Sequence, residues 1–206
     1  SLPDRLQAAG AEVLSVSPDV MQALAEREAA EGVVATFDLF EASLDDLPLA
    51  DGGLVVVLDR LQDPGNLGTL IRTADAVGAA GVVLVEPCVD PFDPKVVRGS
   101  MGSLFHVPLV RTDDVGGLMA ALHRRGLRVV AADAQRGVDW GDGLWHDGVA
   151  LALGNEARGL SADLHPHVDA WARLPIAGYA ESLNVAVAGG VLMYAWLRKR
   201  LEQRET

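Results

Sequence analysis

The chain has 206 residues, half of them apolar, so it can bury a sizeable core and is not expected to be disordered. No apolar run is long enough to span a bilayer, and no signal peptide is visible. The only cysteine, Cys88, excludes an internal disulfide and argues against a cysteine-based metal site. We therefore expect a cytoplasmic protein with neither a membrane partner nor a bound metal.

The net charge of −12 argues against a nucleic-acid partner, but the charge is unevenly distributed. Residues 1–51 hold 11 acidic and 2 basic side chains, whereas residues 52–206 hold 18 acidic and 15 basic ones. The second segment is therefore nearly neutral, and a local basic groove for nucleic acid stays compatible with its sequence.

The first 40 residues predict a helix between two strands, at residues 12–17 and 32–37. Ser17 fits a helix N-cap, with Pro18 at the first helical position. One helix and two strands bury little, so this piece is expected to be part of a larger domain. Residues 41–51 are acidic, lack a clear period and are predicted to be a linker.

From residue 52 onward, strand and helix patterns alternate. The strands are short, nearly continuous apolar runs, which is typical of a parallel sheet covered on both faces. Residues 52–206 are therefore predicted to form one α/β domain, with a mostly parallel sheet flanked by helices. The predicted strands are 54–58, 81–85, 106–110, 128–132, 149–153 and 170–174, and the predicted helices are 67–77, 94–101, 113–125 and 183–201.

The stretch DPGNLGTLIRTADAVG, at residues 63–78, follows the first of these strands. A strand, a glycine-containing turn and a helix suit a dinucleotide, and Glu86 lies where a ribose-binding acid would. However, the G-x-G-x-x-G pattern is absent and Pro64 removes a backbone donor from the turn, so this interpretation is disfavoured. On the helix, Arg72 projects beside small residues such as Gly68, which leaves it open to a bulky substrate. An ordinary solvated arginine paired with an acid explains Arg72 equally well.

Two later strands also end in polar loops. The strand at 149–153 runs into Gly154 and Glu156; the glycine lets the backbone approach a ligand, and Glu156 is expected at a helix N-terminus. An ordinary strand-to-helix turn explains that pattern equally well. The last loop ends at Ser182, which can cap the final helix.

The final helix carries two adjacent glycines, Gly189 and Gly190. Each destabilises a helix interior by roughly 1 kcal/mol relative to alanine. They therefore predict close packing, either inside the domain or against a second subunit.

Three motifs in chain order resemble those of the SpoU (TrmH-like) RNA 2′-O-ribose methyltransferases of the SPOUT superfamily. With the stretch VRGSMGSLFHVP at residues 97–108, the resemblance covers residues 54–201, and residues 1–40 are similar to the latter part of an L30e-like RNA-binding domain. The motif positions are Asn66, Gly68, Arg72 and Ala74 in the first motif, Gly154, Asn155, Glu156 and Gly159 in the second, and Leu174, Pro175, Ile176, Gly178, Ser182, Leu183, Asn184 and Val185 in the third.

The resemblance implies an α/β domain with a C-terminal deep trefoil knot. It implies an enzyme that transfers a methyl group from S-adenosylmethionine to a ribose 2′-hydroxyl of RNA, with rRNA favoured over tRNA because of the N-terminal piece. It also implies a homodimer whose site is completed across the interface and needs no metal, because the methyl donor is already activated by its charge. A non-catalytic RNA-binding module and a dinucleotide-binding oxidoreductase are the alternatives.

The resemblance also implies a set of site residues. Arg72 is expected to stabilise the developing alkoxide by charge and hydrogen bonding, because an unperturbed guanidinium is a poor base. Action of Arg72 as the base is the alternative, and it requires a site that perturbs the guanidinium strongly. A plain helix N-cap explains Asn66 equally well, and a surface arginine explains Arg98. The implied catalytic residues are Arg72, Asn66, Glu156, Ser182 and Asn184; the cofactor contacts are Gly154, Ile176, Leu183, Asp133, Ala134, Asn155 and Gly178; the RNA contacts are Arg72 and Arg98.

Overall fold

The computed structural model describes residues 1–24, 32–49, 53–141, 143–145 and 148–204. Contacts within the chain divide it into two compact units, Ser1–Phe40 and Glu41–Thr206. Each unit is described separately below.

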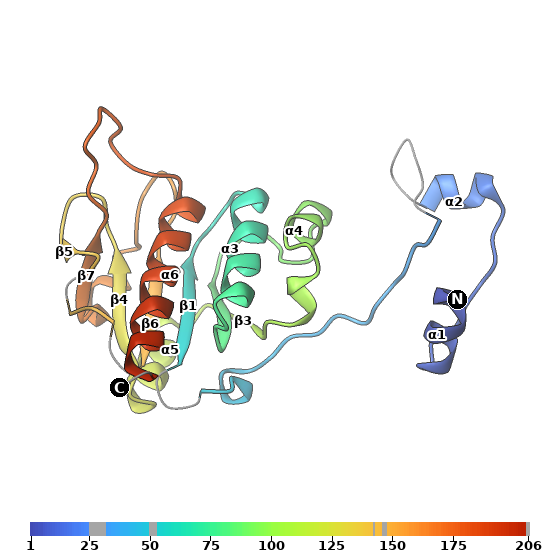
Figure 1. Ribbon diagram of the computed structural model, residues 1–206, viewed down its shortest axis with the longest axis horizontal. Coiled ribbons are helices and arrows are strands. Elements are labelled where there is room, and N and C mark those ends of the chain that lie inside the picture. The colour runs from blue at the N-terminus through green and yellow to red at the C-terminus, as the bar shows by residue number, and fades with distance from the viewer. Residues whose placement is uncertain (25–31, 50–52, 142, 146–147, 205–206) are drawn as a thin grey trace. The chain divides into compact units, whose positions relative to one another are not determined.

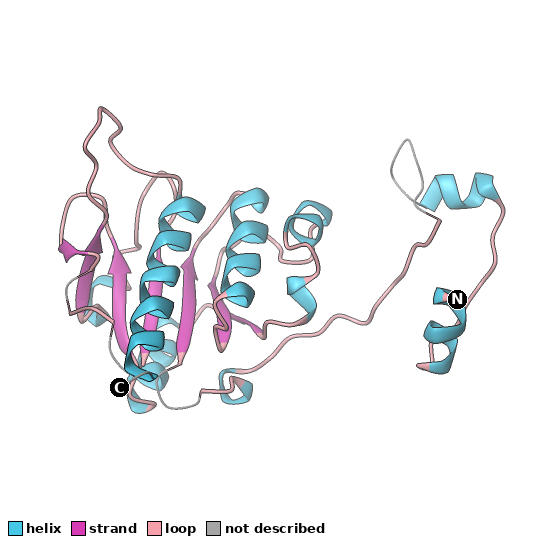
Figure 2. Ribbon diagram, viewed as in Figure 1, coloured by secondary structure: helices cyan, strands magenta, loops and turns pink. Residues whose placement is uncertain are grey.

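The second unit contains a seven-stranded sheet in the order β3-β2-β1-β6-β4-β7-β5 (Figures 1 and 2). All neighbouring strands pair in parallel. The predicted parallel α/β architecture is confirmed, whereas the knot stays a prediction. The strands are β1 (Leu54–Asp59), β2 (Gly81–Val85), β3 (Leu109–Thr112), β4 (Arg128–Ala132), β5 (Val138–Asp139), β6 (Val149–Leu153) and β7 (Ala170–Arg173), and the helices are α3 (Pro64–Ala76), α4 (Pro94–Gly99), α5 (Val115–Arg124) and α6 (Val185–Arg204).

The sheet is buried on both faces because its central strands are nearly continuous apolar runs; β1 is buried along its whole length and only its last residue, Asp59, is polar. In β1, Leu54, Val56 and Leu58 join a core cluster with α3, α4 and α6, whereas Val55 and Val57 join a second cluster with α5. Helices α3 and α6 lie side by side over one face of the sheet (Figure 1). Continuous apolar runs are the pattern expected for such strands.

The adjacent glycines of α6 have different surroundings. A Cβ on Gly189 would lie 2.6 Å from Leu70 Cδ2 and 2.6 Å from Leu153 Cδ1, so this glycine lets α6 approach α3 and β6 closely. A Cβ on Gly190 would meet only Thr73 Cγ2, at 3.9 Å. The close packing predicted from the glycines is therefore confirmed inside the domain for Gly189.

The predicted elements of this unit differ from the structure in most of their ends, by one to three residues, and one strand was missed. The strand predicted at 106–110 is β3, which begins at Leu109, because a 3₁₀ turn, η2 (Ser103–Phe105), occupies the preceding residues. The two-residue strand β5 was too short to give a sequence signal.

The first unit contains α1 (Leu2–Ala8) and α2 (Pro18–Leu24). Ser17 Oγ accepts the Val20 N–H at 3.4 Å, as expected of the predicted N-cap. The strands predicted at 12–17 and 32–37 are wrong, because the described part of this unit has no strand and no buried side chain against which one could pack. The similarity to an L30e-like domain stays a prediction.

The segment predicted as a linker packs on the second unit where it is described. It forms the 3₁₀ turn η1 (Leu44–Asp46) and its Ala42 N–H donates to Leu109 O at 2.8 Å. Leu47 is buried beside Gly81 at the start of β2. Residues 50–51 of the predicted linker lie outside the described residues. Across the described chain, no helix combines the length and apolar character that crossing a membrane requires.

Candidate active site

A cavity of about 670 Å³ lies at the carboxyl ends of β4, β6 and β7. Ligands of open parallel sheets bind at this edge, outside the ends of the strands. Seven residues implied as cofactor contacts were named from the sequence, and six of them line this cavity; Gly178 does not. The lining residues that the resemblance implied as catalytic or cofactor-binding are Asp133, Ala134, Gly154, Asn155, Glu156, Ile176, Ser182, Leu183 and Asn184.

The wall of the cavity that follows β6 is a tight turn rather than the start of a helix. The Asn155 N–H donates to Gly159 O at 3.0 Å, and the Gly159 N–H donates to Asn155 O at 2.8 Å. A Cβ on Gly154 would overlap the backbone of Gly159 and Leu160. Gly154 is therefore required because the loop folds back over it, and the prediction of Glu156 at a helix N-terminus is wrong.

A chain of side-chain hydrogen bonds joins the three predicted motifs. Asn184 Nδ2 donates to Asn66 Oδ1 at 2.9 Å, and Asn66 Nδ2 donates to Glu156 Oε1 at 2.8 Å. The carboxylate only accepts, so it fixes which end of the Asn66 amide faces it. The structure thus brings together residues that are 90 and 118 positions apart in sequence.

The caps of the two helices beside the cavity differ from those predicted. At α3 the N-cap is Asp63, whose carboxylate accepts the Asn66 N–H at 2.8 Å, so Asn66 is not the cap. At α6, Asn184 Oδ1 accepts the N–H groups of Ala186 and Val187 at 2.9 and 3.2 Å, so the cap is Asn184 rather than Ser182. The Asn66 side chain therefore has no capping role, whereas the Asn184 side chain both caps α6 and donates to Asn66.

Arg72 lies on α3 but outside this cluster. Its side chain is exposed and makes no hydrogen bond or ion pair with any residue that the structure describes. Gly68 does not leave space beside it, because a Cβ there would lie 2.9 Å from Val96 O and 3.0 Å from the Gly99 backbone. Gly68 instead allows α4 to approach α3. Arg98, on α4, is also exposed.

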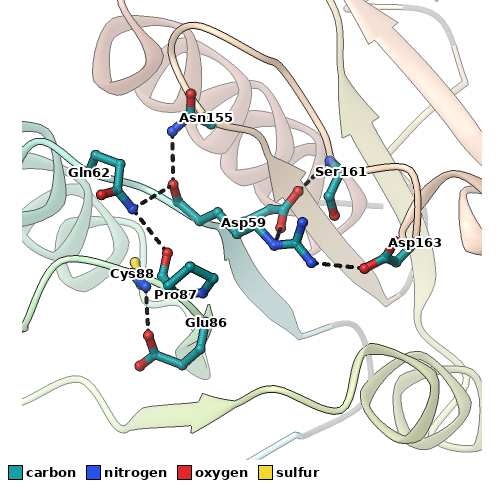
Figure 3. A network of polar contacts seen from close by, with 9 residues as sticks. Asp59, Gln62, Glu86, Pro87, Cys88, Asn155, Ser161 and Asp163 are labelled. Carbon is teal, nitrogen blue, oxygen red and sulfur yellow. Dashed lines mark hydrogen bonds and ion pairs between the residues drawn. The ribbon is translucent and has the colours of Figure 1, made fainter.

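A second polar network lies at the end of β1 (Figure 3). Gln62 Nε2 donates to Arg60 O at 3.3 Å and to Pro87 O at 3.0 Å. The Glu86 carboxylate accepts hydrogen bonds from the Cys88 N–H at 2.6 Å and from the Arg111 Nε–H at 2.7 Å. The bond to Glu86 raises the pKa of Arg111. These contacts count against Glu86 as a ribose-binding acid.

Cys88 belongs to the same network and is part-buried. Burial raises the pKa of its thiol to about 11. The thiol therefore stays protonated near neutral pH and is a poor nucleophile.

Sequence reasoning missed five polar residues at or next to the cavity. Gln135, Arg136 and Glu181 line it, and Asp59 and Arg60 hold its wall from the end of β1. The only sequence signal for Asp59 was an acid ending an apolar strand, and nothing singled out the three lining residues.

The fold and the cavity define an α/β domain with a ligand site at the carboxyl edge of its sheet, and comparison with known proteins gives the family. The SpoU rRNA Methylase family matches residues 53–194. The chain belongs to this family, as the motifs predicted.

Among curated relatives, the 23S rRNA (guanosine(2553)-2′-O)-methyltransferase RlmP of Bacillus subtilis (strain 168) is 37% identical over 185 residues, covering 90% of this chain and 72% of that protein. The 23S rRNA (uridine(2479)-2′-O)-methyltransferase of Streptomyces viridochromogenes is 36% identical over 199 residues, covering 94% of this chain and 69% of that protein.

Among solved structures, the AdoMet-bound rRNA methyltransferase of Sinorhizobium meliloti has a TM-score of 0.88 and 38% identity, covering 95% of this chain and 75% of that one. The SpoU methyltransferase AviRb of Streptomyces viridochromogenes, in complex with the cofactor AdoMet, has a TM-score of 0.75 and 35% identity, covering 80% of this chain and 67% of that one.

Proposed function

We propose that this protein transfers a methyl group from S-adenosylmethionine (AdoMet) to a ribose 2′-hydroxyl of rRNA. The observation that carries the proposal is the cavity, whose lining residues Glu156 and Asn184 are joined through Asn66 in a chain of hydrogen bonds. Family membership and the two 23S rRNA 2′-O-methyltransferases among its relatives support the reaction and the substrate class. A cytoplasmic location is part of the proposal, because rRNA is the substrate.

The residues present fit AdoMet. The cavity volume of about 670 Å³ lies within the range of about 300–1,000 Å³ that is usual for small-molecule sites. Within the described chain, the residues Ala134, Ile176 and Leu183 make no hydrogen bond, so their backbone groups are free for a ligand. These three, with the Gly154 turn, would hold the cofactor.

The bound cofactor supplies a methyl group activated by a sulfonium charge, so the protein must position the ribose and stabilise its oxygen as the proton leaves. Glu156 is held by Asn66 and in turn faces the cavity. Asn66 and Asn184 would orient Glu156 and the ribose, and Ser182 would shape the cavity wall. Arg72 would stabilise the developing negative charge on the 2′-oxygen.

The position of Arg72 outside the cavity lining supports a homodimeric site. Helix α6 exposes Val187, Val191 and Tyr194, which recur at i, i+4 and i+7 and therefore form one apolar face. This face would pack against a second subunit, and neighbouring α3 would then present Arg72 to the cavity of that subunit. Arg72 and Arg98, exposed on adjacent helices, would both contact RNA.

Transfer of labelled methyl groups from AdoMet to purified rRNA and tRNA tests the proposal. We expect label in rRNA, in a form resistant to alkaline hydrolysis because the 2′-oxygen is blocked, and a loss of at least about a hundredfold in Arg72→Ala. Label found only in tRNA would mean that the substrate is tRNA rather than rRNA. RNA binding without incorporation would favour a non-catalytic module.

A further inference from the structure

Two residues at the end of β1 hold both ends of the loop that follows β6. Asp59 Oδ2 accepts the Ser161 N–H at 2.5 Å, at the far end of the loop. The Arg60 carbonyl accepts Asn155 Nδ2 at 2.9 Å, near the start of the loop. The turn between Asn155 and Gly159 is thus fixed from two adjacent positions of one strand end.

Asp59 is unusual because it is a charged side chain with only 1% exposure. Its Oδ1 lies 3.9 Å from Arg60 Nε and, among the described residues, neither atom has a hydrogen-bond partner. Burying a carboxylate oxygen that accepts no hydrogen bond is unfavourable for folding. An apolar side chain at the end of β1 would therefore make the protein more stable. The feature that Asp59 adds is a charge-assisted bond to the Ser161 amide.

Arg60 adds a second unfavourable feature, a backbone φ of 55°. Residues other than glycine rarely adopt this left-handed backbone conformation. In this conformation the Arg60 carbonyl accepts hydrogen bonds from Asn155 Nδ2 and, at 3.3 Å, from Gln62 Nε2. The Arg60 side chain forms an ion pair with Asp163 at 2.8 Å, and both partners are well exposed, so that pair contributes little.

The loop held in this way forms one wall of the cavity. Gly154, Asn155, Glu156 and Gly159 line the cavity, and Glu156 also binds Asn66. We infer that Asp59 and the carbonyl of Arg60 are positioning groups that set this wall in its binding geometry before the cofactor arrives. The identity of the cofactor rests on the proposed function; the anchoring of the loop does not.

The first test compares AdoMet affinity, measured by calorimetry, in Asp59→Asn and in Asp45→Asn. Asp59→Asn keeps the shape of the side chain but removes its charge, so we expect the Kd for AdoMet to rise about tenfold, while kcat at saturating AdoMet falls less than about threefold. Asp45 is exposed and paired with Arg125 away from the cavity, and its variant should keep the wild-type Kd. A lower melting temperature with an unchanged Kd would mean that Asp59 is merely structural and would overturn the inference.

The second test separates the Arg60 carbonyl from the Arg60 side chain. Arg60→Gly and Arg60→Val both lose the ion pair with Asp163, but only glycine adopts the left-handed backbone readily. We expect Arg60→Val to raise the Kd at least about fivefold more than Arg60→Gly does. Equal effects of the two substitutions would overturn the assignment to the carbonyl.

Hydrogen exchange of the unmodified protein is a third test, and it does not depend on whether the Asp59→Asn variant folds. The Ser161 amide is hydrogen-bonded to Asp59 without any ligand, so its exchange should be protected in the absence of AdoMet. Exchange at the rate of an unstructured peptide until AdoMet is added would overturn the inference. If the protein failed to bind AdoMet at all, the proposed function would fail while this exchange result would still stand.

Discussion

Asn184 performs two tasks with the two ends of one amide group. Its oxygen caps α6 through Ala186 and Val187, and its nitrogen donates to Asn66. Because the tasks use different atoms, they can be separated by substitution.

Asn184→Asp keeps an oxygen for the cap and replaces the donor with a second acceptor, which would face Asn66 Oδ1. We expect a melting temperature close to that of the unmodified protein, because aspartate is as good an N-cap as asparagine. Methyl transfer should fall at least about tenfold, because Asn66 loses a partner and Glu156 its alignment. Asn184→Ala is the matched comparison and should lose both functions, with the lost cap costing about 1 kcal/mol of stability. Full activity in Asn184→Asp would exclude a role for the hydrogen-bond chain.

At this scale the residues of the cluster were named from the resemblance to the SpoU family, because each of the three motifs supplies one of them. The structure brings them together at one edge, which the carboxyl ends of parallel strands share. The sequence could not assign the caps, because Asp63 and Asn66, or Ser182 and Asn184, are all good N-cap residues. Gly68 was misread for a related reason: helical geometry shows which residues share a face with Arg72 but not that α4 covers that face.

Among the elements, the crossing of α3 and α4 depends on two glycines. Gly68 and Gly99 face each other, and a Cβ added to Gly68 would meet backbone atoms of α4. Backbone cannot move aside as the end of a side chain can, so the helices would have to separate.

Gly68→Ala should therefore destabilise the protein by about 1–3 kcal/mol, although alanine favours a helix. Gly116→Ala, in the exposed first turn of α5, is the matched control: its Cβ would come no closer than 3.7 Å to Asp114 Oδ1. We expect this control to leave stability unchanged or to raise it slightly. Denaturant unfolding of the two variants measures the difference, and equal stabilities would show that α3 and α4 can separate freely.

The elements of the second unit were predictable because buried parallel strands are continuous apolar runs bounded by glycine and polar residues. The same pattern failed in the first unit, where the apolar residues at 12–17 and 32–37 are exposed and have no neighbouring strand. An apolar run becomes a strand only if a partner supplies its hydrogen bonds, and the sequence of one segment does not show whether a partner exists.

For the whole molecule, the separation of Arg72 from the cavity is the feature that needs explanation. In one chain, Arg72 makes no bond to the Asn66–Glu156–Asn184 cluster within the described residues. A symmetric dimer through the exposed face of α6 would contain two identical sites, each with a cavity from one subunit and an arginine from the other. The sequence motifs named both parts of such a site, whereas its completion across an interface was implied only by the family resemblance.

Methyl transfer by purified heterodimers tests this account most directly. One subunit would carry Arg72→Ala and the other Asn184→Asp, with different affinity tags, and each variant alone should be nearly inactive on rRNA. In the mixed dimer, one site would combine an intact cavity with an intact arginine, so we predict about half the activity of the unmodified dimer. Mixed dimers as inactive as their parents would contradict a shared site and would require Arg72 to act, if at all, on the cavity of its own chain.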